Sequence, residues 1–150
     1  MKTILLFLLI TACAQKPVSI SPQITEFVET WKSDYTSNSN EAAQRYQSYL
    51  TSVELIYAKS EQSHKFPDYL STLHSNFQIL LDREYNVAGI YRKTVKDRRK
   101  MSFNQWKQDH LKDLRDRLTS QREQKLKEQV GTVLFEKLKE NHKEFREFPL

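Results

Sequence analysis

Glycine and proline are scarce in this chain: of its 150 residues, two are glycine and four are proline. A β-rich domain of this length needs many more turn-forming residues, because tight turns join its short strands. The glycines, Gly89 and Gly131, stand alone, which excludes a glycine-rich loop that could cradle phosphates. Together with many Lys, Glu, Gln, Leu and Arg residues, this scarcity favours an all-α fold.

Cysteine and histidine are also rare. Cysteine occurs once, at Cys13, so no disulfide can form within the chain. The four histidines are scattered, with none paired at i, i+4 and no HExxH motif; they are His64, His74, His110 and His142. Because metal sites need converging ligands at defined spacings, we expect no metal and no other cofactor.

No motif for nucleophilic catalysis is present. The chain has no Gly-x-Ser-x-Gly sequence, and its histidines are too sparse to define a catalytic triad. A pair of carboxylates for sugar hydrolysis can lie far apart in a sequence, so an envelope hydrolase stays open as a lesser alternative. We expect no enzyme activity and assign no catalytic residue.

The longest apolar run comprises residues 4–10 and follows a single cation, Lys2. A helix that spans a bilayer needs roughly 20 apolar residues, so this run is too short for one. A cationic start, a short apolar run and small residues are typical of a secretory signal peptide. The alternatives are a buried N-terminal helix or an uncleaved anchor.

Ile10-Thr11-Ala12-Cys13 resembles the lipobox of bacterial lipoproteins, although Ile stands where that family more often has Leu. The resemblance implies that the Cys13 thiol receives a diacylglyceryl group, that residues 1–12 are removed, and that the new amino terminus is acylated. Two or more acyl chains give stable membrane anchoring, whereas one gives marginal binding. Because Ala14 rather than Asp follows the cysteine, the family's sorting habits imply the periplasmic face of the outer membrane in a Gram-negative cell.

Beyond Cys13, residues 13–20 show no apolar periodicity and are expected to form a lipidated tether, with one helical domain over residues 21–150. Apolar residues at helical spacing predict a helix that begins at Ser21 and Pro22, a second over residues 41–61, and a third that opens at Asp68 after a break at Pro67. The predicted first stripe is Ile24, Phe27, Val28, Trp31 and Tyr35. The expected fold is a small all-α bundle of four to six helices behind a short flexible tether.

The second half of the chain is less regular. Residues 92–100 read as a continued helix or a helical linker. Two possible capping boxes, Ser102 with Gln105 and Ser120 with Glu123, indicate either two helices or one long helix that runs through. Residues 119–125 hold no apolar residue, which favours a bend or a solvent-exposed turn there. The last apolar positions are Leu126, Val130, Val133, Leu134, Leu138 and Phe145.

Positive charge gathers in the second half. Residues 14–82 hold five Lys or Arg against eight Asp or Glu, whereas residues 83–150 hold 18 against 11. The densest basic run supplies the candidate patch for an anionic partner: Arg92, Lys93, Lys96, Arg98, Arg99 and Lys100. A solvated helix face is the plainer alternative. An export signal argues against nucleic acid, so an envelope protein, anionic lipid or lipopolysaccharide is the expected contact.

Two functions fit these features. The first is an envelope-anchored helical lipoprotein that binds and localises or stabilises another envelope component; in size and helical character the chain is similar to the helical pilotins of secretion systems. The second is an immunity or exclusion lipoprotein that blocks a toxin or an incoming element.

Overall fold

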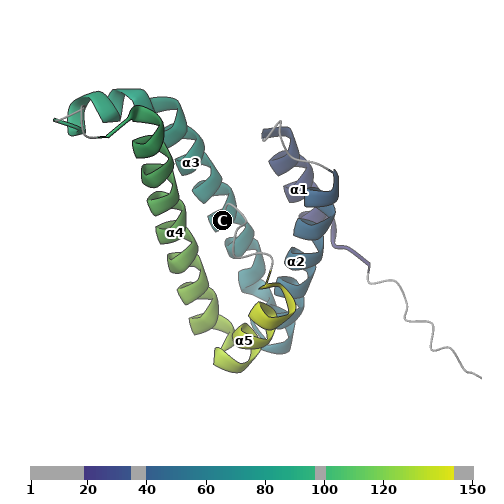
Figure 1. Ribbon diagram of the computed structural model, residues 1–150. Coiled ribbons are helices and arrows are strands. Elements are labelled where there is room, and N and C mark those ends of the chain that lie inside the picture. Colours follow the sequence, from purple (N-terminus) through teal and green to yellow (C-terminus); the bar gives the residue numbers. More distant parts are fainter. Residues whose placement is uncertain (1–18, 35–39, 97–100, 144–150) are drawn as a thin grey trace, which may run out of the picture.

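The computed structural model describes residues 19–34, 40–96 and 101–143 (Figure 1). Within these residues the chain forms five α-helices and one 3-10 turn, and no strand. They are α1 (Pro22–Asp34), α2 (Asn40–Lys59), η1 (Ser63–Lys65), α3 (Phe66–Thr94), α4 (Phe103–Val130) and α5 (Thr132–Asn141). The predicted all-α bundle is therefore confirmed. Several predicted positions lie outside the described residues: Cys13, Tyr35, Arg98, Arg99, Lys100 and Phe145.

The helices form two pairs joined at one end. Figure 1 shows α1 beside α2 and α3 beside α4, with α5 at the base, where it contacts both α4 and α2. The N-terminal part of α3 belongs to the shared core up to Leu80, whereas Val87 and Tyr91 are buried outside that core. The far ends of α3 and α4 thus extend beyond the core as a hairpin. We call residues 83–96 and 101–110 the hairpin tip.

The core is rich in aromatic side chains. Trp31 of α1 lies 4.9 Å from Tyr46 of α2, measured between ring centroids, and Tyr46 meets Phe77 of α3 edge-on at 6.4 Å. Ile24 and Val28 are also buried, as expected for one stripe at helical spacing. Such ring pairs stabilise a core beyond the area that they remove from water, so the aromatic cluster fixes α1 and α2 against α3.

Helix α3 begins before the predicted break. Its first residue is Phe66, and Pro67 lies in its first turn, where the missing N–H costs no intrahelical hydrogen bond. The preceding 3-10 turn, η1, brings the chain around from α2. Phe66 is buried, which explains why the helix starts there and not at Asp68.

The second half forms two helices, but they separate at Gly131 and not at Ser120. Helix α4 runs without interruption through residues 119–125 and ends at Val130, and its C-cap Gly131 has φ 88° and ψ 157°. Ser120 and Glu123 therefore do not open a helix, whereas Ser102 does: its side chain accepts a hydrogen bond from the Gln105 N–H. The expected exposure of residues 119–125 holds for most of them, which are exposed or half-buried, but not for Arg122, which is buried.

Candidate functional site

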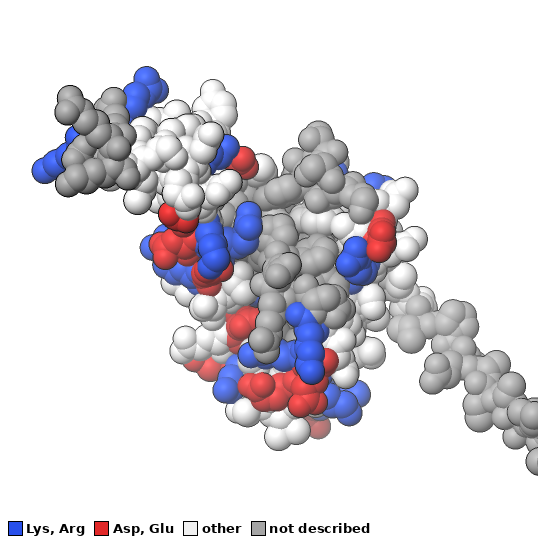
Figure 2. Space-filling model, in the orientation of Figure 1, with Lys and Arg blue, Asp and Glu red and all other residues white. Residues whose placement is uncertain are grey.

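The described part of the predicted basic patch lies at the hairpin tip. Arg92 and Lys93 are in the last turn of α3, and Lys96 follows that helix; all three are exposed. The structure thus shows helix up to Thr94, which answers the question left open for residues 92–94. Figure 2 shows blue cationic side chains at this end of the molecule, far from the base.

A small aromatic cluster holds the tip together. The Tyr91 hydroxyl donates a hydrogen bond of 2.9 Å to the Met101 carbonyl and so joins the end of α3 to the residues that lead into α4. The Tyr91 ring lies 5.2 Å from Phe103 and 5.3 Å from Trp106, and Trp106 stacks on His110 at 4.6 Å. The tip is therefore a folded element, and its cations stand on a defined scaffold.

Electrostatics at the tip keep His110 neutral at physiological pH. Burial first, and then the nearby Arg83 guanidinium, lower the pKa of His110. The Arg83 Nη1 lies 3.2 Å from the His110 Nε2. Because a guanidinium only donates, Nε2 must accept, and protonation of Nε2 would break this bond.

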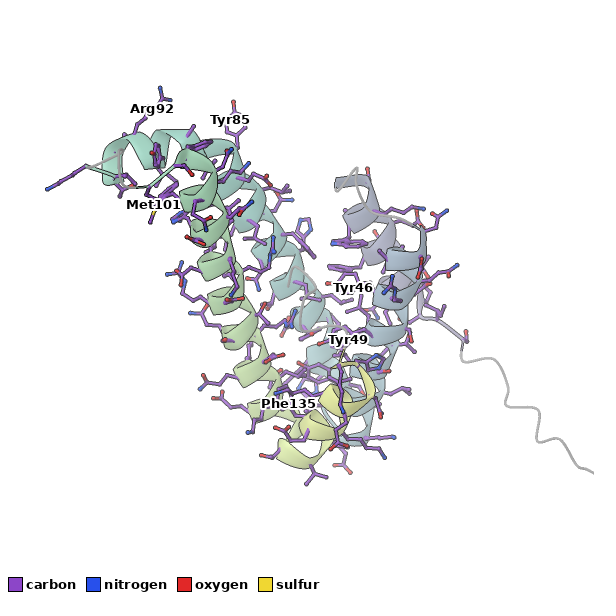
Figure 3. The ribbon with its side chains drawn as sticks, viewed as in Figure 1. Tyr46, Tyr49, Tyr85, Arg92, Met101 and Phe135 are labelled. Atoms are coloured by element: carbon purple, nitrogen blue, oxygen red, sulfur yellow. The ribbon has the colours of Figure 1, made fainter. Side chains whose placement is uncertain are left out.

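Large exposed side chains accompany the basic residues. Tyr85 is 90% exposed and Met101 is 39% exposed, and both lie at the tip with Arg92 in Figure 3. An aromatic ring, a thioether and cations on one element provide both apolar and charged contacts. This combination is common at surfaces that bind other molecules.

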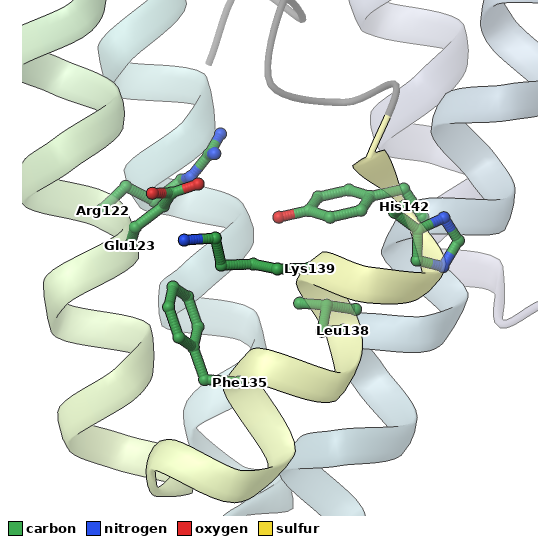
Figure 4. A pocket seen from close by; sticks show the side chains of 7 residues that line it. Arg122, Glu123, Phe135, Leu138, Lys139 and His142 are labelled. Carbon is green, nitrogen blue, oxygen red and sulfur yellow. The ribbon is translucent and has the colours of Figure 1, made fainter.

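A second candidate site lies at the base, where α2, α4 and α5 meet around a cavity of about 20 Å³. Its walls carry two cationic side chains, a histidine, a tyrosine, a carboxylate and apolar side chains (Figure 4). The lining residues are Tyr49, Arg122, Glu123, Phe135, Leu138, Lys139 and His142. The volume admits a water molecule or another small polar group, and it is too small for a sugar ring or a nucleotide.

Arg122 is the unusual member of this site. Its side chain is 5% exposed, and its Nε is buried without a hydrogen-bond partner in the structure as described. Burial lowers the pKa of Arg122, but the combined effect of Tyr69, Tyr49 and other nearby groups raises it by more. The pKa therefore lies above its ordinary value. The guanidinium is therefore charged at neutral pH.

The groups around Arg122 are mainly tyrosine hydroxyls. The Tyr49 and Tyr69 hydroxyl oxygens are 3.2 Å apart and share a hydrogen bond. Burial raises the pKa of Tyr69 well above its ordinary value, so its phenol keeps its proton. Among the described residues Arg122 thus faces mainly uncharged hydroxyl dipoles, and the Glu123 carboxylate is a lesser influence on its pKa.

His142 and Lys139 form the other side of the cavity. The His142 Nε2 lies 2.8 Å from the Ser52 hydroxyl oxygen of α2, and its ring meets Tyr49 edge-on at 5.6 Å. Lys139 lies 5.3 Å from the Phe135 ring centroid, within the range of a cation–π contact. Both side chains are half-buried, so they stand at the mouth of the cavity.

Reasoning from sequence missed this base site. One signal in the sequence is the tyrosine-rich stripe of α2, which comprises Tyr46, Tyr49 and Tyr57. Such a stripe is typical of a core with hydroxyls at its rim or of a groove that binds a partner. A second signal is that Arg122 occupies the middle of a strict i+4 series. The other members of the series are all buried: Leu114, Leu118, Leu126 and Val130.

The described residues contain neither a cluster of metal-binding side chains nor a helix that could span a membrane. No group of three or more His, Cys, Asp or Glu side chains in residues 19–34, 40–96 and 101–143 is placed to hold a metal ion. None of the helices described is both long and apolar enough to cross a membrane.

Comparison with known proteins identifies no relative. No family model matches the chain, and no curated protein or solved structure is significantly similar to it. Its function must therefore be argued from its own residues.

Proposed function

We propose that this chain is a lipid-anchored helical adaptor of the bacterial cell envelope, which binds an acidic envelope protein through its hairpin tip and localises or stabilises it. The observation that carries the proposal is the placement of Arg92, Lys93 and Lys96. They lie at the end of a hairpin that extends beyond the shared core and has an aromatic cluster of its own. The lipobox resemblance supports the anchor at Cys13.

Charge and shape both support an anionic partner for the tip. The second half of the chain has a surplus of seven cations over acids. Cations on a projecting element meet a partner before the body of the domain does, and a complementary potential speeds such encounters. The exposed Tyr85 and Met101 supply apolar contact area beside them.

The tip is tested by charge removal with a matched control. Replacement of Arg92, Lys93 and Lys96 by Gln is expected to weaken binding about tenfold, since each exposed ion pair contributes up to about 1 kcal/mol. The control replaces three exposed lysines of the body, Lys59, Lys125 and Lys137, and so removes the same net charge. The measurement is recovery of crosslinked envelope proteins from cells that express each full-length variant.

Equal loss in both variants would show that net charge and not the tip is responsible. If the wild-type chain is crosslinked to no protein but binds vesicles of anionic lipid, the partner of the tip is a lipid surface and not a protein. Unchanged recovery from the tip variant would refute the proposed role of the patch.

The anchor is tested separately with Cys13→Ser. The wild-type chain is expected to incorporate labelled fatty acid and to fractionate with membranes, and the variant to do neither. A variant that is still labelled and still membrane-bound would contradict lipidation at Cys13.

A further inference from the structure

A buried, charged side chain that forms no ion pair with a carboxylate of the described residues is the least explained feature of the described fold. Arg122 is 5% exposed, and its Nε is both buried and unpartnered in the described residues. No ion pair between Arg122 and a described carboxylate is present, although the Glu123 carboxylate also lines the cavity. Removing a charge from water carries a large penalty unless an opposite charge and hydrogen bonds compensate.

The surroundings of Arg122 fit one kind of ligand. A guanidinium presents parallel N–H donors that match the two oxygens of a carboxylate. Lys139 adds a second cation at the mouth of the cavity, and His142 and Tyr49 add polar groups to its wall. The small volume of the cavity, about 20 Å³, restricts the ligand to one small polar group. Glu123 disfavours a doubly charged anion such as phosphate, because it places a negative charge in the same wall.

We infer that the cavity at the base is a carboxylate-binding site, in which Arg122 pairs with the two oxygens and Lys139 closes over them. Such a site can take its carboxylate from outside, as a small organic acid or an acidic side chain of another protein. The chain itself also holds candidate acids nearby in sequence, since Glu144 follows Lys143 and Glu147 comes three residues later. The inference does not rest on the proposed function, since it involves neither Cys13 nor the hairpin tip.

The test is a nuclear magnetic resonance titration of the full chain in detergent micelles, read at the Arg122 Nε–H resonance. The probe is sodium acetate, with sodium chloride at the same ionic strength and pH as the reference. Arg122→Lys assigns the resonance by removing it. Arg117, an exposed arginine of the same helix, is the internal control for a non-specific effect of salt.

A saturable shift of the Arg122 resonance with acetate, absent with chloride and absent at Arg117, is the expected result for an external carboxylate. If Glu144 or Glu147 already fills the site, acetate shifts the resonance only in the double variant Glu144→Gln, Glu147→Gln. Both results support a carboxylate site, and they distinguish its source. No saturable shift in either chain would overturn the inference and leave water as the partner of Arg122.

The role of Lys139 has its own control. In whichever chain responds to acetate, Lys139→Gln is expected to weaken acetate binding about threefold to tenfold, whereas Lys137→Gln, which removes an exposed charge from the same helix, should not change it. Equal affinities in both variants would remove Lys139 from the site. Substitution of Cys13 or of the tip cations leaves the titration unchanged, so failure here is distinct from failure of the adaptor proposal.

Discussion

Replacement by alanine is expected to change the free energy of unfolding in opposite directions at the two glycines. Gly131 separates α4 from α5 with φ 88°, a conformation that side chains with a Cβ rarely adopt. Its N–H donates to the Lys127 carbonyl at 2.9 Å, and its carbonyl accepts from the Phe135 N–H at 3.2 Å. Gly89 lies inside α3, and a Cβ added there meets nothing within 4 Å.

The magnitudes follow from these two settings. Gly131→Ala should lower the free energy of unfolding by about 1 to 3 kcal/mol, because alanine must hold the strained backbone or give up the two hydrogen bonds that aim α5. Gly89→Ala should raise it by about 0.4 to 1 kcal/mol, because alanine loses less backbone entropy in a helix. The two variants should therefore differ by about 1.5 to 4 kcal/mol.

Chemical denaturation followed by circular dichroism measures both values, and the melting temperature should move by about 2 to 4 °C per kcal/mol for a chain of this length. The pair controls for composition, since each variant adds one methyl group. Equal stabilities in the two variants would refute the assigned conformation at Gly131. A stable Gly131→Ala protein would also place Phe135 and Leu138 in doubt as members of the core.

Two further predictions concern a titration and the core. Because burial and Arg83 lower the pKa of His110 below its ordinary value of 6.5, the unfolded chain binds this proton more readily than the folded one. Its contribution to stability is full above pH 6.5 and is lost as the pH falls toward the lowered pKa. His110→Gln should flatten this part of the curve of unfolding free energy against pH, measured by chemical denaturation at a series of pH values. Leu126, which is 1% exposed, should cost about 2 to 5 kcal/mol when replaced by Ala, whereas Leu55→Ala, at a position 47% exposed, should cost less than about 1 kcal/mol in the same denaturation assay.

The helices of the first half could be predicted because their apolar residues repeat at helical spacing. Ile24, Val28 and Trp31 follow that spacing and are buried as predicted. The start of α3 could not be predicted as well, because a proline ends a helix or occupies its first turn equally well from sequence. Burial of Phe66 decides between these readings, and burial depends on residues distant in sequence.

The second half was harder because its helices are highly charged and its breaks do not coincide with capping motifs. Ser102 and Ser120 carry the same capping pattern, yet only Ser102 begins a helix. Helix α4 continues past Ser120 because buried side chains hold the turns before and after it, Leu118 on one side and Leu126 on the other. Gly131 is the position that permits the sharp change of direction.

Arg122 shows why counting apolar residues fails for the base site. Buried side chains of α4 recur every fourth residue, so each step rotates the stripe by about 40° around the helix. Helix α4 contacts α3, α2 and α5, and Arg122 lies near tyrosines of both α2 and α3. A long side chain at that junction packs its apolar stem in the core and carries its charged head to the cavity beyond. Arg122 therefore stands at the spacing of a core residue but carries a charged head group that needs a polar or anionic partner. Only the spacing and the charge together point to the base site.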